Sequence, residues 1–176
     1  MGRIIGSVVL AVAVSGCASW LPVIEPGATT EAEIQDTYGR PSFRRPEPEG
    51  ASTLVYATQP MGISCLMVEV DASGRVLNAR DALGDRNLAR VEVGMTLAQI
   101  DRLLGPHRTE VFFPLSGEWV WDWNVPHFGP GIATRFNVHF KEGVVVRASR
   151  SFVPGGPTGG SDIRPPMVVP CPRCDP

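Results

Sequence analysis

A helix-like segment occurs twice in this chain, and this duplication constrains the fold more than any other feature. Residues 30–39 are TEAEIQDTYG and residues 96–105 are TLAQIDRLLG. Each segment opens with a threonine three residues before a Glu or Gln, a capping-box pattern that satisfies free backbone N–H groups at a helix start. Each ends at a glycine, Gly39 or Gly105, with a proline within two residues, a pattern that terminates helices. We therefore expect two equivalent short helices, one in each half of the chain.

After each of these segments the apolar residues follow the period of two that is typical of β-strands. In the first half this pattern covers residues 52–58, 64–70 and 75–83, and in the second half residues 108–113, 118–125, 134–140 and 144–152. Val68 and Val138, Ala79 and Ala148, and Tyr56 and Trp121 are the positions that we expect to be equivalent. Each half is thus predicted as a short helix or helix pair followed by a three- to four-stranded antiparallel meander. The predicted fold class is α+β, with two tandem repeats.

The two halves are too small to be stable separately. A single small sheet with one helix has a marginal core, so we expect the two copies to pack side by side. We place the first copy at residues 24–83, a linker at residues 84–90 and the second copy at residues 91–153. Residues 154–176 are rich in Pro and Gly without periodicity, which predicts an extended or disordered tail.

The N-terminus has the pattern of a bacterial lipoprotein signal peptide. Residues 4–14 form an apolar run of eleven, about half of the length that spans a bilayer as a stable helix. The box Val14-Ser15-Gly16-Cys17 resembles a lipobox, in which the cysteine is acylated and becomes the new N-terminus. Residues 1–16 would then be the signal peptide and residues 17–23 an acylated tether. The alternative is an ordinary signal peptide or short membrane helix with an incidental cysteine.

The residues after Cys17 predict where a lipoprotein of this kind would reside. Ala18 and Ser19 follow the cysteine, with no aspartate beside it. By resemblance to enterobacterial sorting rules, this implies transfer to the outer membrane. Several acyl chains anchor far more firmly than one, so attachment through Cys17 to outer-membrane lipid would be essentially permanent. We expect the body of the protein to face the periplasm.

Composition and motifs argue against nucleic-acid binding and against catalysis. The net charge is −2, without the basic patch or stripe of a nucleic-acid-binding protein. His107, His127 and His139 do not form a constellation, and His139 alternates with apolar residues, so its side chain should point away from the core into solvent. Nucleophile-elbow, Walker and zinc-protease motifs do not occur. We therefore expect a protein that is not an enzyme and has no cofactor or metal.

Three tryptophans share one face of a predicted strand in the segment GEWVWDWNVP. Trp119, Trp121 and Trp123 alternate with Val120, Asp122 and Asn124, so their indoles point the same way. One interpretation is that all three pack on the helix at residues 96–105. The other is that at least one is exposed and, together with Phe128, anchors a binding partner, because Trp and Tyr are enriched at binding hot spots.

The remaining cysteines offer little chemistry. Cys171 and Cys174 form a C-x-x-C pair, but a structural zinc site needs four ligands and only two are present here. In an oxidising periplasm the two thiols would form a small disulfide or remain idle, and a thiol–disulfide activity is a further hypothesis. Cys65 lies in a predicted strand and is expected to be a buried small hydrophobe.

The chain resembles the SmpA/OmlA (BamE-like) family of outer-membrane lipoproteins. After the lipobox it has Gly94-Met95-Thr96 at a helix start, Gly105-Pro106 at its end, an aromatic strand at residues 119–123 and the hairpin VHFKEGVV at residues 138–145. Residues 27–83 match the same order more weakly. The resemblance implies an α+β unit with two short helices against three antiparallel strands. It also implies an accessory role in β-barrel assembly or envelope integrity.

This chain differs from the BamE-like proteins in carrying two copies of the unit. Tandem copies also resemble the β-lactamase-inhibitor-protein fold, whose members bind enzymes with an aromatic sheet face. The leading hypothesis is therefore a non-catalytic outer-membrane lipoprotein that binds envelope proteins such as the barrel-assembly machinery. The alternative is a membrane-anchored inhibitor or binding module against a periplasmic or secreted enzyme.

Overall fold

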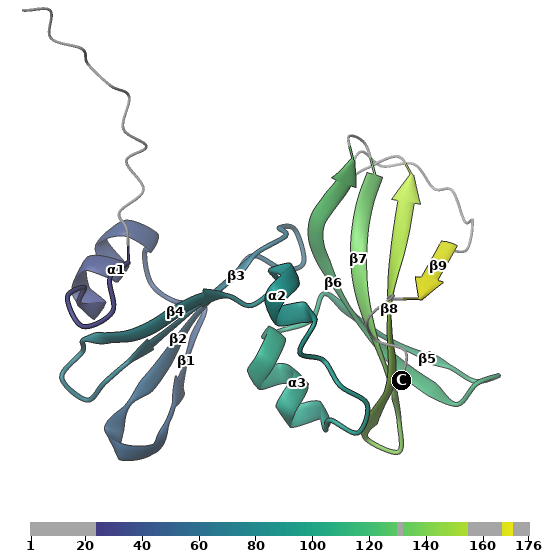
Figure 1. Ribbon diagram of the computed structural model, residues 1–176, viewed down its shortest axis with the longest axis horizontal. Helices are drawn as coiled ribbons and strands as arrows, with labels where there is room; N and C mark the ends of the chain where they lie inside the picture. Colours follow the sequence, from purple (N-terminus) through teal and green to yellow (C-terminus); the bar gives the residue numbers. More distant parts are fainter. Residues whose placement is uncertain (1–23, 130–131, 155–166, 171–176) are drawn as a thin grey trace, which may run out of the picture.

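The computed structural model describes residues 24–129, 132–154 and 167–170, which form two antiparallel sheets (Figure 1). The first sheet has the strand order β1 (Phe43–Pro46), β2 (Ser52–Ala57), β3 (Cys65–Val70) and β4 (Val76–Asp81). The second has the order β5 (Thr109–Phe113), β6 (Glu118–Gly129), β7 (Ile132–Lys141), β8 (Val144–Pro154) and β9 (Met167–Pro170). The helices are α1 (Glu31–Tyr38), α2 (Asp85–Leu88) and α3 (Leu97–Leu104), with a 3-10 turn η1 (Pro48–Gly50). This arrangement confirms the predicted α+β fold with two repeated units.

Both predicted capping boxes form, with nearly the same geometry. In the first copy Thr30 N–H donates to the Glu33 carboxylate at 2.7 Å, and Glu33 N–H donates to Thr30 Oγ1 at 3.4 Å. In the second copy Thr96 and Gln99 make the corresponding bonds at 2.8 and 3.3 Å. Each capping threonine also forms an isolated antiparallel bridge, Thr30 with Arg75 just before β4 and Thr96 with Val144 at the start of β8. The same local sequence therefore fixes each helix against its sheet in the same way.

The strand register is repeated together with its irregularity. A β-bulge interrupts the pairing between Glu69 and Val70 in one copy and between His139 and Phe140 in the other. Val68 pairs with Ala79 and Val138 pairs with Ala148, so both of these predicted equivalences are confirmed.

The predicted equivalence of Tyr56 with Trp121 is wrong. Val68 lies opposite Leu54, and Val138 lies opposite Trp121, so Leu54 is the counterpart of Trp121 in the ladder. Matching aromatic residues by eye shifted this strand by two positions. Such a shift leaves the same face of the sheet buried, and the apolar pattern alone therefore could not detect it.

The two copies stack in the order α1, first sheet, α3, second sheet (Figure 1). One face of the first sheet packs against Ile34 of α1. Its other face, with Val55 and Met67, shares a second core with Ile100 and Leu104 of α3, and this core continues into the second sheet. The helix of the second copy therefore covers both sheets, whereas α1 covers one. Because the larger core crosses the boundary between the copies, we expect both halves to unfold together.

Two segments predicted as linker and tail contain regular secondary structure. Residues 84–90 are more than a linker, because they contain α2 and place Leu88 in the shared core. The buried Asn87 amide donates to the carbonyls of Ala82 and Leu103, at 2.8 and 2.9 Å, and so joins the copies. The tail at residues 154–176 was expected to be extended or disordered, and residues Met167–Pro170 form the extended strand β9, which pairs with β8. The rest of the tail, from residue 155, lies outside the described residues.

Candidate functional site

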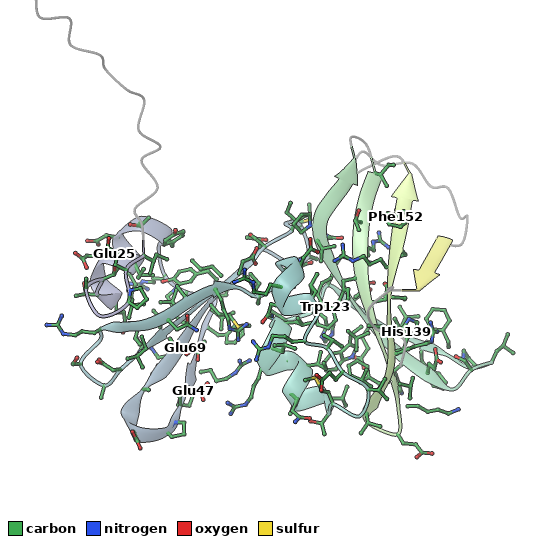
Figure 2. All side chains as sticks on the ribbon, in the orientation of Figure 1. Glu25, Glu47, Glu69, Trp123, His139 and Phe152 are labelled. Carbon is green, nitrogen blue, oxygen red and sulfur yellow. The ribbon has the colours of Figure 1, made fainter. Side chains whose placement is uncertain are left out.

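The three tryptophans of β6 occupy three different environments. Trp123 is fully buried between α3 and the second sheet, and its indole N–H donates to the Gly105 carbonyl at 3.2 Å (Figure 2). Trp121 is half-buried and stacks on His107, with ring centroids 4.4 Å apart. Trp119 is 46% exposed. The side chains point the same way, as the alternation predicts, but Trp123 is a core residue whereas Trp119 reaches solvent.

Trp119 belongs to an exposed apolar cluster at the end of the β5–β6 hairpin. We call this cluster the apolar tip; each member is at least 44% exposed, and the members are Val111, Phe112, Phe113, Leu115 and Trp119. Phe112 and Trp119 are cross-strand partners with ring centroids 5.0 Å apart. Because side chains alternate along a strand, Val111 and Phe113 point to the opposite face. The tip is therefore apolar on both of its faces.

Of the residues in this cluster, Trp119 alone was predicted to bind a partner. Three consecutive apolar residues, 111–113, cannot all face one core, because alternate residues point to opposite sides of a strand. That run was the available signal. Phe128, the other residue proposed for binding, lies in β6, but its side chain is outside the described part of the structure.

The apolar tip also includes a free sheet edge. β5 is the outer strand of its sheet, and β1 is the outer strand at the equivalent place in the first copy. β1 has the sequence Phe-Arg-Arg-Pro, and charged residues and proline on an edge strand prevent pairing with another chain. β5 has the sequence Thr-Glu-Val-Phe-Phe and no such protection along its last three residues. The second copy therefore exposes an edge that the first copy protects.

The other face of the second sheet carries a hydrogen-bonded polar row. His139 Nε2 lies 3.0 Å from Ser149 Oγ, and His139 Nδ1 lies 3.0 Å from Glu118 Oε2. Arg147 donates to the same carboxylate at 2.8 Å, and the Asn137 amide donates to Ser151 Oγ at 3.2 Å. His139 was expected in solvent. It does point away from the apolar core, but it is 6% exposed and bonded through both ring nitrogens.

The order Ser149–His139–Glu118 has the connectivity of a nucleophile, a base and an orienting acid. A nucleophilic hydroxyl must reach a substrate, however, and Ser149 is 1% exposed with the Asn137 amide also within 3.5 Å of its oxygen. The row is therefore a satisfied network in the folded chain. The equivalent face of the first sheet packs on α3 with apolar side chains, whereas this face carries buried polar ones.

This network makes stability depend on pH in a defined direction. Burial, followed by the nearby Arg147, lowers the pKa of His139, and the hydrogen bond from Arg147 lowers the pKa of Glu118. The unfolded histidine therefore binds a proton at a higher pH than the folded one. The stabilisation is complete above the ordinary histidine pKa and is lost as the pH falls through the folded value.

We expect the free energy of unfolding to decrease between pH 7 and pH 5, with a slope approaching about 1.4 kcal/mol per pH unit where only the unfolded histidine is protonated. His139→Gln should flatten this slope, even if it lowers stability at every pH. Urea unfolding at half-unit intervals of pH measures both slopes. The measurement stops at pH 5, because the stabilisation contributed by ionised Glu118 is lost as the pH falls below the ordinary pKa of a glutamate. Equal slopes for the two proteins would contradict this assignment.

The described cysteine is a core residue, as predicted. Cys65 is fully buried in the shared core, and burial, with a smaller effect of Asp81, raises the pKa of its thiol to about 12. The thiol is therefore protonated and unreactive at neutral pH. The proposed lipid-attachment residue Cys17 and the proposed pair Cys171 and Cys174 lie outside the described residues.

Two further observations concern the described ranges alone. No group of three or more His, Cys, Asp and Glu side chains in them is arranged to hold a metal ion. In the same ranges no helix has both the length and the apolar character needed to span a bilayer.

Comparison with known proteins adds little to this geometry. No protein-family model matches the chain, and no curated protein matches it. A crystal structure described as a "putative beta-lactamase inhibitor protein" from Streptococcus mutans is 12% identical in sequence to this chain. The match covers 69% of this chain and 82% of the other chain, with a TM-score of 0.30. A superposition this poor carries no argument about function, which must be argued from the site itself.

Proposed function

We propose that this protein is a non-catalytic outer-membrane lipoprotein that binds other envelope proteins through its apolar tip. The single observation that carries the proposal is the set of five exposed apolar side chains at the end of the β5–β6 hairpin, three of them on the edge strand β5. Exposed apolar clusters of this kind mark interaction sites, and aromatic residues supply much of the binding energy at such sites. The resemblance to the SmpA/OmlA family supports an accessory role in β-barrel assembly or envelope integrity.

The anchoring part of the proposal depends on the N-terminal sequence. A lipobox ending at Cys17 would attach the body to outer-membrane lipid and leave it in the periplasm. A free sheet edge can accept a strand from a partner, with main-chain hydrogen bonds for affinity and the flanking side chains for specificity. β5 offers such an edge between Val111 and Phe113.

The protruding tip also supports a second function, as an anchored inhibitor or binding module against an enzyme. Leu115 at the turn is fully exposed, and the hairpin extends beyond the body of the second sheet (Figure 1). A projecting apolar turn of this shape would fit an enzyme cleft. The identity of the captured partner distinguishes the two functions.

Crosslinking in living cells tests the tip directly. A photoreactive amino acid at position 115 of the full chain should capture an envelope protein. Phe112→Ser with Trp119→Ser should reduce that capture about 30-fold, since losing a hot spot costs about 2 kcal/mol or more. Val93→Ser is the matched control, because Val93 is 59% exposed but lies outside the tip.

Each result of this experiment decides between the functions. Capture of a barrel-assembly subunit supports the accessory role, and capture of a periplasmic or secreted enzyme supports inhibition. Equal capture by the double variant and the control would contradict binding through the tip. Capture of further copies of this chain alone would also contradict it.

A further inference from the structure

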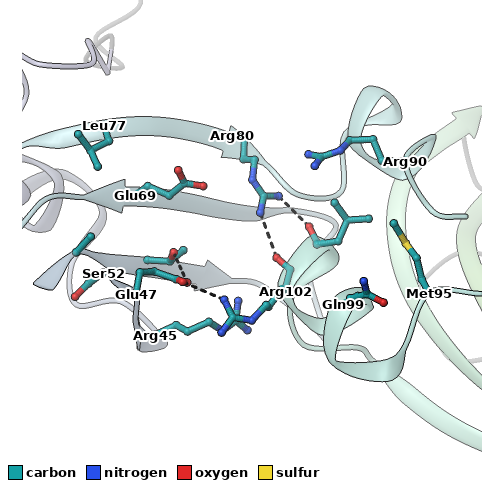
Figure 3. A pocket seen from close by; sticks show the side chains of 13 residues that line it. Arg45, Glu47, Ser52, Glu69, Leu77, Arg80, Arg90, Met95, Gln99 and Arg102 are labelled. Atoms are coloured by element: carbon teal, nitrogen blue, oxygen red, sulfur yellow. Dashed lines mark hydrogen bonds and ion pairs between the residues drawn. The ribbon is translucent and has the colours of Figure 1, made fainter. Parts of the chain in front are cut away.

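A groove of about 530 Å³ lies between the two copies, away from the apolar tip (Figure 3). The first sheet forms one wall, and α3 together with the segments before it forms the other. We call it the inter-repeat groove. Its charged lining residues are four arginines and two glutamates: Arg45, Arg80, Arg90, Arg102, Glu47 and Glu69.

Two of the four arginines are neutralised by ion pairs. Arg45 contacts the Asp101 carboxylate at 2.7 Å, and Arg102 contacts the Glu47 carboxylate at 3.0 Å. Arg80 and Arg90 have no such ion pair with any residue that the structure describes. Glu69, near Arg80, is the remaining carboxylate of the lining, so the four arginines stand against Glu47, Glu69 and Asp101, an excess of one positive charge, although the whole chain has a net charge of −2.

The two uncompensated arginines are held close together by one amide oxygen. Asn87 Oδ1 accepts from Arg80 Nη1 at 3.4 Å and from Arg90 Nη1 at 3.1 Å. Asn87 is itself fixed, because its amide nitrogen is buried and bonded to two carbonyls. The two guanidinium groups carry like charges and repel each other, and an anion placed between them would relieve this repulsion.

Arg80 is also rigid and partly removed from water. It donates to the carbonyls of Leu103 and Arg102, at the C-terminal end of α3, at 2.9 and 3.2 Å. Burial lowers the pKa of its guanidinium, and the nearby Glu69 opposes that shift. A desolvated and immobile cation loses little further entropy or hydration when it binds an anion. Arg80 is therefore preorganised for binding.

Apolar side chains lie beside these charges. Leu77, which is 53% exposed, lines one wall of the groove, and Met95 and Leu103 line the other. A bare inorganic anion would leave these residues uncovered. A peptide with acidic and aliphatic side chains would satisfy both kinds of surface.

We propose that the inter-repeat groove binds an acidic peptide segment of a partner protein, with one carboxylate placed between Arg80 and Arg90. The planar guanidinium group matches the geometry of a carboxylate, and such charge-assisted hydrogen bonds are stronger than neutral ones. The inference rests on the proposed function as a protein-binding lipoprotein. It adds the chemistry of the bound segment and a second site that acts together with the apolar tip.

Binding of a defined peptide to the purified full chain in detergent tests this proposal. The probe is a fluorescent hexapeptide, Leu-Glu-Asp-Leu-Glu-Leu, compared with its amide counterpart, Leu-Gln-Asn-Leu-Gln-Leu, by fluorescence anisotropy. The acidic peptide should bind at least tenfold more tightly, and the difference should shrink in high salt, which screens charge. Arg90→Gln should weaken its binding about tenfold. Arg40→Gln, at an exposed position outside the groove, should leave binding unchanged.

Three results would overturn the proposal: equal affinity for the two peptides, unchanged binding by Arg90→Gln, or binding of inorganic phosphate as tightly as the acidic peptide. Arg90 is exposed, so its substitution should leave the urea midpoint unchanged and the variant folded. Trp119→Ser should retain peptide binding, because it changes the tip and not the groove. Loss of peptide binding would therefore contradict the groove proposal alone, and loss of partner capture would contradict the tip proposal alone.

Discussion

Replacement of Trp123 by alanine should lower the free energy of unfolding by about 3–5 kcal/mol, the usual range for removing a buried aromatic side chain. Trp123 is fully buried in the core that the two copies share, and its neighbours come from both. The variant also loses the hydrogen bond from the indole to Gly105. The cavity cannot be filled without moving α3 relative to the second sheet. Because this core joins the copies, both halves should be destabilised together.

Trp119→Ala is the matched control for this prediction. Trp119 lies on the same strand and face as Trp123 but is 46% exposed, so its loss should change stability by less than about 1 kcal/mol. Urea unfolding, followed by both far-ultraviolet circular dichroism and fluorescence, measures the two variants. Similar losses in both variants would contradict the assigned burial. Separate transitions for the two probes would contradict one shared core.

The duplication could be predicted because the interactions that define each copy are local in sequence. A threonine cap, a reciprocal Glu or Gln and a terminating glycine each act within a few residues, so the sequence pattern nearly specifies the geometry. The observed capping boxes at Thr30 and Thr96 agree within 0.1 Å for each bond. The meander after each helix is similarly local, since its strands are joined by short turns.

The arrangement of the copies could not be predicted in the same way. α3 buries an apolar stripe, whereas α1 buries Ile34 alone. That α3 is covered by two sheets and α1 by one depends on contacts between distant residues. α2 was missed because a helix of four residues is too short to show periodicity. β9 was missed because its only partner among the described strands, β8, is separated from it by more than ten residues of chain.

The apolar tip and the inter-repeat groove were predicted only in part, because they too depend on contacts between distant residues. The alternation of side chains correctly predicted that the three tryptophans share one face. Which of them is exposed depends on the position at which α3 ends along that face. The pair of Arg80 and Arg90 depends on Asn87, which lies between them in sequence and was assigned to a linker. No pattern of residue types in the sequence distinguishes these two arginines from any others.

The two copies differ in how their sheets and edge strands are covered, and this difference suits the second copy for binding. The first sheet is covered on both faces, and its edge strand is protected by Arg44, Arg45 and Pro46. The second sheet packs one face on α3 and has an edge strand, β5, that lacks such protection. The first copy therefore supports the fold and one wall of the groove. The second copy carries the exposed aromatic residues.

Gly105→Ala should destabilise the protein by about 2–6 kcal/mol, more than the equivalent change in the first copy. Gly105 ends α3 with φ at 77° and ψ at −168°, outside the left-handed helical region. This region of backbone space is almost restricted to glycine and costs other residues about 1–3 kcal/mol. A Cβ atom here would also lie 2.8 Å from Cys65 Sγ and 3.0 Å from Met67 Cε. Such overpacking adds roughly 1–3 kcal/mol.

Gly39→Ala isolates the backbone contribution, because Gly39 ends α1 with φ at 77° and ψ at −162°, and a Cβ atom added there would meet nothing within 4 Å. We expect this variant to lose about 1–3 kcal/mol, from backbone strain alone. Urea unfolding of the two variants beside the wild type gives both values, and their difference measures how closely α3 approaches the first sheet. Equal losses would mean that the copies are packed less tightly than the contact of Gly105 with Cys65 requires.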